Sequence, residues 1–359
     1  MKKVLHVVAT RPNYIKASPV INSIDFCDQI ILNTGQHYDS ILSTDIMKSL
    51  NMRKPDINLS IPKNYGTFER LSFLLAEIPK HIQLVNPDMI VVYGDVDSTA
   101  AAAIVASRLG VPIAHVESGL RSFDNTMPEE LNRRMVDSLA SLHFVTEKSG
   151  VQNLKREGHA DSIFFVGNSM IDSLKSMINS ENFKKSKFCN DNNILFTCHR
   201  PSNVDCSKNL QKILDVCGLI NKKIVWPLHP RTEKNIKKFG LWDKFTSVPN
   251  LELISPLNYC DFVKMMSTSK LVITDSGGVQ EETTYLKVPC LTIRENTERP
   301  VTITDGSNRL VSYNQLVDYT NSILQKYEKS AALPVLWDGN AGKRISDKIL
   351  LYLNNEITI

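Results

Sequence analysis

The sequence lacks the features that indicate membrane, nucleic-acid or zinc binding. No run of about 18 uncharged apolar residues occurs, so we predict no membrane-spanning helix and no membrane partner. The 42 basic and 38 acidic residues leave a formal net charge of only +4, without a long basic run, which argues against nucleic acid as a partner. The seven cysteines are odd in number and form no C-x-x-C pair. This cysteine pattern favours free thiols in a reducing cytoplasm and no metal site.

Three common catalytic or cofactor-binding motifs are also absent. The sequence has no G-x-G-x-x-G, the signature of enzymes that work through bound NAD, and no Walker A lysine loop for ATP. It has no G-x-S-x-G either, which argues against an α/β-hydrolase. We therefore expect chemistry without a bound cofactor.

What the sequence does have is a regular alternation of short apolar runs with segments of helical periodicity. This βαβ rhythm predicts an α/β protein built from parallel sheets. With 359 residues, the chain is too long for one core of common size, so we expect two domains. The predicted strands span residues 3–9, 30–33, 89–93, 112–116, 142–145 and 163–166, and then 193–197, 223–226, 251–254, 271–274 and 289–293.

The crossover between the two domains is predicted just after the strand 163–166. We expect residues 1–167 to form the first domain and residues 168–341 the second, with the C-terminal segment 342–359 packing back on the first. In doubly wound domains, ligands bind beyond the carboxyl ends of the strands, so two such domains facing each other form a cleft. The motifs at strand ends are therefore the candidate functional sites.

The motif Thr-Asp-Ser-Gly-Gly-Val-Gln-Glu-Glu at 274–282 ends a predicted strand and opens a predicted helix. Ser276, Gly277 and Gly278 would lie at the helix N-terminus, where backbone N–H groups and the helix dipole favour an anion. Glu282 would lie further along, where its carboxylate can accept hydrogen bonds from ribose hydroxyls. An ordinary glycine turn would explain the two glycines alone, but their combination with paired acids favours a site for a nucleoside diphosphate.

Charged residues also follow the strands of the first half. Arg11 and Lys16 come after the first strand, where they could contact phosphate, although two solvated cations in a surface turn would give the same pattern. Asp95 and Glu117 come after two later strands that are expected to be central. Acids at such positions are costly to bury unless they are paired or used in chemistry. Helix capping is an alternative for Asp95, but it does not explain Glu117.

Glu129, His199 and His229 are candidates on weaker patterns. Glu129 and Glu130 lie in the first turn of a helix opened by proline, where the helix dipole accounts for one glutamate but not obviously for two. His199 and His229 each follow a strand of the second half. One such histidine is usually structural, whereas two at equivalent strand ends favour a shared site.

Taken in order, the motifs resemble those of the non-hydrolysing UDP-N-acetylglucosamine 2-epimerases. That family has the GT-B fold, in which two Rossmann-like doubly wound domains face a central cleft. The resemblance covers nearly the whole chain. It rests on T-R-P-x-x-I-K at 10–16, G-Q-H at 35–37, G-D at 94–95, H-V-E-S-G-L-R at 115–121, P-E-E-L-N-R at 128–133, H-R-P-S-N-V at 199–204, D-S-G-G-V-Q-E-E at 275–282 and R-E-N-T-E-R-P at 294–300.

The resemblance implies a reaction and a set of residues for it. The reaction is reversible C2 epimerisation of UDP-N-acetylglucosamine to UDP-N-acetylmannosamine, through elimination of UDP to 2-acetamidoglucal and re-addition, for surface polysaccharide precursors. The implied catalytic residues are Asp95, Glu117, Glu129 and His199. The implied substrate-binding residues are Arg11, Lys16, His229, Leu257, Phe262, Ser276, Gly277, Gly278, Glu282 and Arg299, with Phe262 and the main chain near Leu257 at the uracil.

The resemblance also implies a cytoplasmic homodimer that takes a UDP-sugar as substrate. Many bacterial members have a second, activating UDP-sugar site that uses Gln and Arg side chains. Asp39, Tyr65 and Pro201 occupy those positions here, so the resemblance does not carry this activation over. Four alternatives use the same nucleotide motif: a 2-epimerase of another UDP-sugar such as a diacetamido uronic acid, a hydrolysing epimerase, a GT-B glycosyltransferase and a UDP-sugar-binding regulator.

Overall fold

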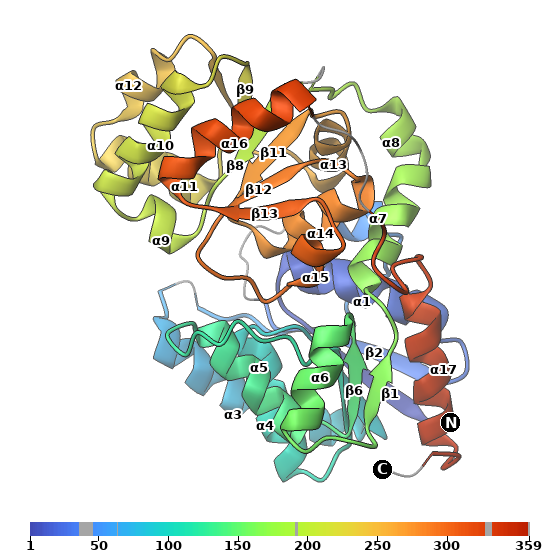
Figure 1. The fold of residues 1–359 in the computed structure, drawn as a ribbon. Helices are drawn as coiled ribbons and strands as arrows, with labels where there is room; N and C mark the ends of the chain where they lie inside the picture. Colours follow the sequence, from blue (N-terminus) through green and yellow to red (C-terminus); the bar gives the residue numbers. More distant parts are fainter. Residues whose placement is uncertain (36–45, 63, 191–192, 327–331, 358–359) are drawn as a thin grey trace. The chain divides into compact units, whose positions relative to one another are not determined.

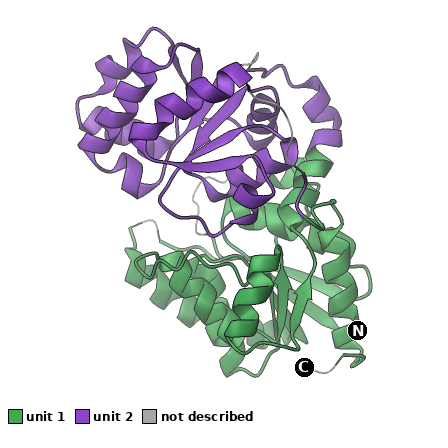
Figure 2. Cartoon of the chain, in the orientation of Figure 1, with its two compact units in different colours: residues 1–177, 335–359 green, residues 178–334 purple. Residues whose placement is uncertain are grey.

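The computed structural model describes residues 1–35, 46–62, 64–190, 193–326 and 332–357. These residues form two compact units, which are unit 1 (residues 1–177 with 335–359) and unit 2 (residues 178–334), shown in Figure 2. The division falls later than the crossover expected after residue 167, because the next helix contacts unit 1. Its Ser173 Oγ donates a hydrogen bond to the carbonyl of Ile15 at 2.6 Å. Gln36 and His37 of the G-Q-H motif, and also Asp39, lie outside the described residues.

Within the described residues, unit 1 contains a seven-stranded parallel sheet in the order β3-β2-β1-β4-β5-β6-β7. The structure confirms the strands predicted for this half and adds the two-residue edge strand β3, which is too short to give a sequence pattern. The strands are β1 (Lys3–Val8), β2 (Asp28–Asn33), β3 (Ile57–Asn58), β4 (Met89–Tyr93), β5 (Ile113–Ser118), β6 (Leu142–Val145) and β7 (Ile163–Phe165). The helices are α1 (Arg11–Ser23), α3 (Thr67–Val85), α4 (Asp97–Arg108), α5 (Pro128–Leu139), α6 (Lys148–Arg156), α7 (Ser169–Asn179) and α17 (Ala341–Leu353).

The centre of the unit 1 sheet is buried on both faces. All five residues of β4 are buried, as expected for a continuous apolar run in a parallel sheet. The alanine run of α4, residues 100–103, packs in one apolar cluster with Leu5 and Val92 of the sheet. Small side chains let this helix approach the strands closely. Three buried histidines, His6, His115 and His143, are the polar exceptions inside these strands, and the candidate charged residues lie where the strands end.

Unit 2 repeats this architecture. Over its described residues it has a six-stranded parallel sheet in the order β10-β9-β8-β11-β12-β13. The strands are β8 (Ile194–Thr197), β9 (Ile224–Pro227), β10 (Leu251–Ile254), β11 (Leu271–Thr274), β12 (Cys290–Ile293) and β13 (Asn308–Val311). The helices are α8 (Glu181–Lys185), α9 (Pro201–Val204), α10 (Ser207–Leu219), α11 (Pro230–Lys238), α12 (Trp242–Thr246), α13 (Tyr259–Ser267), α14 (Gly277–Leu286), α15 (Val301–Thr304) and α16 (Tyr313–Lys326). The prediction missed β13. No helix in the described parts of either unit is long and apolar enough for a membrane crossing.

The strand order reverses once in each sheet. In unit 1 the chain moves outward from β1 through β2 to β3 and then returns to the other side of β1 at β4. In unit 2 the chain moves outward from β8 through β9 to β10 and returns to the other side of β8 at β11 (Figure 1). The loops that leave two such strands diverge, and the space between them is where doubly wound domains bind ligands. The carboxyl ends of β1, β4, β8 and β11 are therefore the positions to examine.

The C-terminal helix α17 packs against α1 in unit 1. A Cβ atom added at Gly342 would lie 2.5 Å from the carbonyl oxygen of Pro19, so only glycine permits this approach. Ser346 Oγ donates to the carbonyl of Ser23 at 2.8 Å, and the N–H of Gly342 donates to Asp172 Oδ2 at 2.7 Å. The carboxylate of Asp172 thus joins α7 to the first turn of α17.

We predict that Asp172 makes the stability of unit 1 depend on pH. Burial raises the pKa of Asp172 to about 6, despite the hydrogen bonds from the α17 backbone. The folded state therefore holds this proton more tightly than the unfolded state, and about 2–3 kcal/mol of stability is lost as the pH rises from about 4 to about 6. Asp172→Asn removes this titration. The melting temperature of the variant, relative to that of the wild type at the same pH, should therefore rise between about pH 4 and about pH 6. The exposed Asp347→Asn on α17 is the control, and a parallel pH curve for Asp172→Asn would contradict the prediction.

Candidate active site

The first turn of α1 connects the ends of β1 and β4 in unit 1. Asn13 Oδ1 accepts hydrogen bonds from the backbone N–H and the hydroxyl of Thr10 at 3.1 and 3.0 Å, which caps the helix. Asn13 Nδ2 donates to the carbonyl of Tyr93, the last residue of β4, at 2.8 Å. The helix is therefore anchored at the switch point of the sheet, with Arg11 exposed in its first turn and Lys16 buried one turn later.

Lys16 forms a buried ion pair with Glu117 of β5. Its Nζ atom lies 2.7 Å from Glu117 Oε2, and the two side chains are only 6% and 3% exposed. A Cβ atom added at Gly94, which has a φ of +63°, would lie 2.8 Å from the same Nζ. The glycine after β4 therefore leaves the space that the ammonium occupies. A pair so far out of water holds its two charges in fixed positions, because separating them would leave each charge buried alone.

The backbone at Glu117 is strained. Its φ of +74° lies in the left-handed region, and the pairing of β5 with β6 shifts register between Val116 and Ser118. Left-handed conformations cost a residue with a side chain of this size free energy that surrounding contacts must offset, and such residues concentrate at functional sites. The β-bulge directs this carboxylate away from the position that a regular strand would give it.

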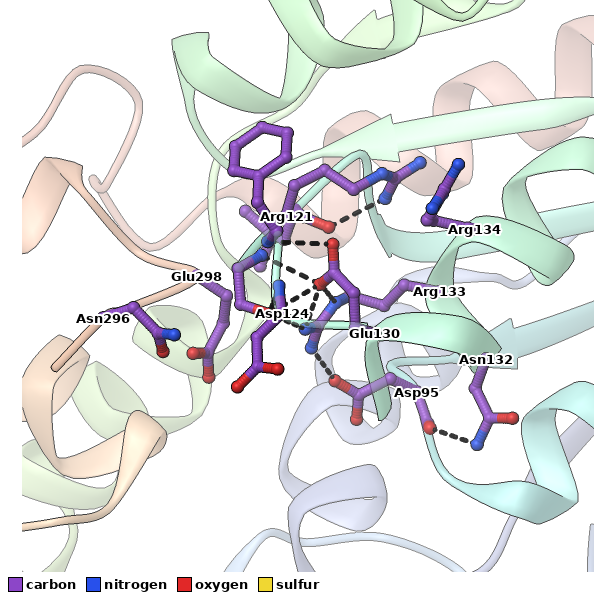
Figure 3. Close-up of polar contacts among 12 residues, drawn as sticks. Asp95, Arg121, Asp124, Glu130, Asn132, Arg133, Arg134, Asn296 and Glu298 are labelled. Atoms are coloured by element: carbon purple, nitrogen blue, oxygen red, sulfur yellow. Dashed lines mark hydrogen bonds and ion pairs between the residues drawn. The ribbon is translucent and has the colours of Figure 1, made fainter. Parts of the chain in front are cut away.

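Asp95, at the end of β4, belongs to a second network that is centred on Arg133 of α5 (Figure 3). Arg133 Nη1 lies 2.5 Å from Asp95 Oδ2, and Arg133 Nη2 lies 2.6 Å from Glu130 Oε2. Asn132 Nδ2 donates to the carbonyl of Asp95 at 3.0 Å. The helix thus holds both the side chain and the main chain of Asp95.

Glu130, rather than Glu129, is the buried acid of α5. Glu130 accepts hydrogen bonds from the N–H and hydroxyl of Ser122 at 2.8 and 2.9 Å and from the N–H of Phe123 at 3.1 Å. Burial would raise the pKa of Glu130, but the Ser122 N–H and Arg133 outweigh burial and lower it. Glu129, the predicted assisting residue, is exposed in the same turn. Sequence reasoning did not select Glu130 and Arg133, although their i, i+3 spacing on a helix was a usable signal.

In unit 2, the buried carboxylate of Asp275 joins the ends of β8 and β11. It accepts from the backbone N–H groups of His199 and Arg200, at 3.1 and 2.8 Å, and from Asn203 Nδ2 at 3.0 Å. Cys198 Sγ lies 2.8 Å from Asp275 Oδ2, and this contact, together with burial as the larger cause, raises the pKa of the thiol well above its ordinary value. Asp275 therefore holds the segment that follows β8 against the end of β11. The sequence analysis included Asp275 in the glycine motif but assigned it no role.

The glycine motif opens α14 as predicted, with Ser276 at the N-cap and Gly277 and Gly278 in the first turn. A Cβ atom added at Gly277 would lie 2.8 Å from Arg299 Nη1 and 2.9 Å from Glu298 Oε1, so a charged pair packs directly on the helix start. The first N–H groups of a helix have no acceptor within the helix, and the dipole adds partial positive charge. Together with the adjacent guanidinium, this geometry favours a bound anion such as phosphate.

Arg299 is held by two buried acids. Its Nε lies 2.9 Å from Glu281 Oε2, and its Nη1 pairs with Glu298. Glu298 Oε2 also pairs with Arg294 Nη2 at 2.8 Å. Burial would raise the pKa of Glu298, but the two guanidinium groups outweigh burial and hold it well below its ordinary value. The guanidinium of Arg299 therefore has a fixed position beside the helix terminus.

The two predicted histidines lie together. The rings of His199 and His229 stack with their centroids 5.3 Å apart, and His199 Nδ1 lies 3.6 Å from Asp275 Oδ1. His229 is also the N-cap of α11, where its Nδ1 accepts from the N–H of Arg231 at 3.2 Å. His229 therefore has a structural role in addition to any contact with a ligand.

The residues implied for ribose and uracil occupy one side of unit 2. Glu282 is buried in α14, and its Oε1 accepts a hydrogen bond from the hydroxyl of Tyr259 at 2.9 Å. Phe262 and Leu257 are partly buried and pack against the apolar cluster that contains Val279 of α14. A fixed carboxylate next to an apolar surface suits a nucleoside, which presents ribose hydroxyls beside a flat base.

Comparison with known proteins gives one consistent family. The family model described as UDP-N-acetylglucosamine 2-epimerase matches residues 21–350. The UDP-N-acetylglucosamine 2-epimerase of Methanocaldococcus jannaschii is 39% identical over 96% of this chain and 98% of its own length. The UDP-2,3-diacetamido-2,3-dideoxy-D-glucuronate 2-epimerase of Pseudomonas aeruginosa is 35% identical, over 98% of this chain and 99% of its own.

The solved structures agree with the sequence matches. The crystal structure of the M. jannaschii UDP-GlcNAc 2-epimerase in complex with UDP-GlcNAc and UDP aligns with a TM-score of 0.89 and 38% identity. That alignment covers 98% of this chain and 99% of the other. The predicted α/β class, with two Rossmann-like domains of the GT-B fold, is confirmed.

We predict that Arg133 is essential to the stability of unit 1, whereas its neighbour Arg134 is not. Arg133→Met leaves Glu130 buried without its cation, which should cost about 3–5 kcal/mol of unfolding free energy. Arg134, which is exposed and donates to Asn125 at 3.2 Å, is the matched control, and Arg134→Met should cost less than about 1 kcal/mol. Urea unfolding measures both values. Equal small losses would show that the Arg133 network does not carry the stability assigned to it.

Proposed function

The chain belongs to the UDP-N-acetylglucosamine 2-epimerase family, and we propose that it interconverts UDP-N-acetylglucosamine and UDP-N-acetylmannosamine by eliminating and re-adding UDP. It is an isomerase that acts on a nucleotide sugar. The product serves as a precursor of surface polysaccharide. The observation that carries the mechanism is the buried, strained carboxylate of Glu117 at the end of β5, next to β4, which Asp95 follows by two residues.

The substrate chemistry explains the need for two acids. The C2 proton of the sugar is not adjacent to a carbonyl group, so its direct removal is very difficult. Departure of UDP from C1 builds positive character that acidifies the C2 proton. A carboxylate then accepts this proton as the C1–O bond breaks, which gives 2-acetamidoglucal and UDP. Return of a proton to the opposite face of C2, with re-addition of UDP to C1, completes the inversion.

Asp95 and Glu117 are the proposed proton-transfer groups, and one serves each face of C2. Both are positioned by a cation, since Arg133 holds Asp95 and Lys16 holds Glu117. General acid–base catalysis requires such fixed geometry, because proton transfer needs donor and acceptor within hydrogen-bond reach. Glu129 and His199 act as assisting residues.

The UDP group is assigned to unit 2. The N-terminus of α14, with Ser276, Gly277 and Gly278, binds the diphosphate, and Glu282 accepts hydrogen bonds from the ribose. Phe262 and the main chain near Leu257 contact the uracil. Arg11, Lys16, His229 and Arg299 surround the phosphates and the sugar. These donors stabilise the negative charge that develops on departing UDP.

The proposal includes a cytoplasmic homodimer. Support for this comes from the family alone, and light scattering of the purified protein measures the oligomeric state directly. A monomer at the concentrations used for catalysis would remove this part of the proposal and leave the reaction unaffected.

We predict that the protein in D2O converts UDP-N-acetylglucosamine into UDP-N-acetylmannosamine that carries deuterium at C2. Proton NMR follows the reaction without an acceptor or added cofactor. Free N-acetylmannosamine with UDP would identify a hydrolysing enzyme instead. If the protein converts only UDP-2,3-diacetamido-2,3-dideoxy-D-glucuronate, its substrate specificity is that of the Pseudomonas aeruginosa relative. No conversion of either sugar would contradict the proposal.

Asp95→Asn should lower kcat by about 10²–10⁴-fold, because the amide cannot accept the C2 proton. Its affinity for UDP should not change, since Asp95 is not among the residues assigned to UDP. The matched control is Asp88→Asn, which alters the acid at the amino end of the same strand, where Asp88 accepts from the N–H of Lys3 at 2.8 Å. Stopped assays give kcat, and calorimetry gives the UDP dissociation constant. A variant that turns over like the wild type would remove Asp95 from the mechanism.

A further inference from the structure

Unit 1 contains a fully buried carboxylate, that of Asp137, which contacts the residues on both sides of Glu117 in the sequence. Asp137 of α5 has no solvent exposure and is surrounded by donors. Its Oδ1 lies 2.6 Å from His115 Nδ1 and 2.5 Å from Ser118 Oγ. Its Oδ2 lies 3.1 Å from the backbone nitrogen of Gly119 and 2.7 Å from Arg121 Nη2. The mechanism above assigns no role to this residue.

The histidine beside Asp137 faces an acceptor on each side. His115 is fully buried in β5, and its Nε2 lies 2.9 Å from the carbonyl oxygen of Gly94. A carbonyl only accepts, so Nε2 must carry a hydrogen. Nδ1 faces the carboxylate of Asp137, whose Oδ1 also accepts the Ser118 hydroxyl, and so Nδ1 carries a hydrogen as well. With an ionised Asp137, this hydrogen-bond pattern places a hydrogen on both ring nitrogens of His115.

Asp137 balances this buried positive charge and that of Arg121. Burial would raise the pKa of Asp137, but His115, Arg121 and the Ser118 hydroxyl outweigh burial and lower it. The guanidinium of Arg121 also pairs with Glu157 at 2.6 Å, so its charge is shared between two acids. The charged groups of the network are paired and its polar groups are hydrogen-bonded at each of these contacts, which makes it rigid.

The contacts of this network bracket Glu117 in the sequence. His115 lies two residues before Glu117, and Ser118 and Gly119 follow it directly. All three are tied to the carboxylate of Asp137, so both flanks of the strained residue are held from one point on α5. His115 also hydrogen-bonds to the carbonyl of Gly94, the residue directly before Asp95. The hydroxyl of Ser118 supplies one of these contacts.

We propose that the His115–Asp137 ion pair is a positioning device that holds Glu117 in its left-handed conformation and sets it in register with Asp95. Neither residue of the pair touches the substrate. The inference rests on the proposed function, because it assigns the pair a purpose through the two acids of that reaction. It explains why a histidine and an acid are kept charged in a core where apolar side chains would pack without a desolvation cost.

The first test is Asp137→Asn. In either orientation, the amide turns its NH2 group toward donors, so the segment 115–119 shifts. A misplacement of this kind should lower kcat by about 10²-fold. KM and the affinity for UDP should stay unchanged, and the primary isotope effect of deuterium at C2 should increase because proton transfer becomes slower. His143→Gln is the matched control, since His143 is equally buried on the neighbouring strand but bonds to Ser162 and to the main-chain carbonyl of Asp137.

The outcomes separate positioning from general stability. Equal losses of kcat in Asp137→Asn and His143→Gln, or wild-type kcat in a folded Asp137→Asn protein, would overturn the proposal. If Asp137→Asn does not fold, Ser118→Ala is the milder variant, and it should lower kcat with KM unchanged; no change would count against the proposal. The losses in His115→Gln and Asp137→Asn should also be non-additive in the double variant, because the pair acts as a unit.

A second measurement does not depend on turnover. In the 15N spectrum of histidine-labelled wild-type protein at neutral pH, both ring nitrogens of His115 should carry hydrogen, and His115→Gln identifies the signals. A neutral single tautomer would overturn the ion pair, whatever the enzyme does. An imidazolium at His115 in a protein that does not exchange the C2 proton would contradict the proposed function and leave the ion pair standing.

Discussion

In both units, the candidate functional residues depend on ion pairs that are buried away from water. A lone buried charge is several kcal/mol less stable than the same charge in solvent, so each one requires a partner with good geometry. Lys16 with Glu117, Arg133 with Glu130, and Arg299 with Glu281 meet this requirement at 2.6–2.9 Å. Such pairs add little net stability, but they give each charged group a single position, and acid–base chemistry depends on that.

The two units use the same strand reversal for different chemistry. In unit 1 the acids Asp95 and Glu117 lie at the carboxyl ends of β4 and β5, the first two strands on one side of the reversal. In unit 2 the reversal places a helix N-terminus after β11, where the small residues from Ser276 to Gly278 leave the backbone accessible to an anion. The proposed function assigns proton transfer to unit 1 and most of the nucleotide contacts to unit 2.

Much of this arrangement could be predicted from local pattern. Continuous apolar runs such as 89–93 identify central parallel strands, because both of their faces are buried. The residues that follow these runs must lie at one edge of the sheet, which located Asp95 and Glu117 and made the pairing of His199 with His229 credible. The prediction was weaker on α5, where the two adjacent glutamates differ by about 100° around the helix and only the structure shows that Glu130 is the buried one.

The sequence by itself determined the fold class, most strand positions, the glycine-rich helix start and the family, because these depend on periodicity and on short motifs that are contiguous in the chain. Only the tertiary structure decided which charges meet. Asp137 reaches His115, and Asp275 reaches the backbone of His199, across separations of 22 and 76 residues. The left-handed backbone of Glu117 is equally invisible in the sequence, since a glutamate adopts it only where surrounding contacts compensate for the strain. Those contacts come from distant segments, and folding alone brings them together.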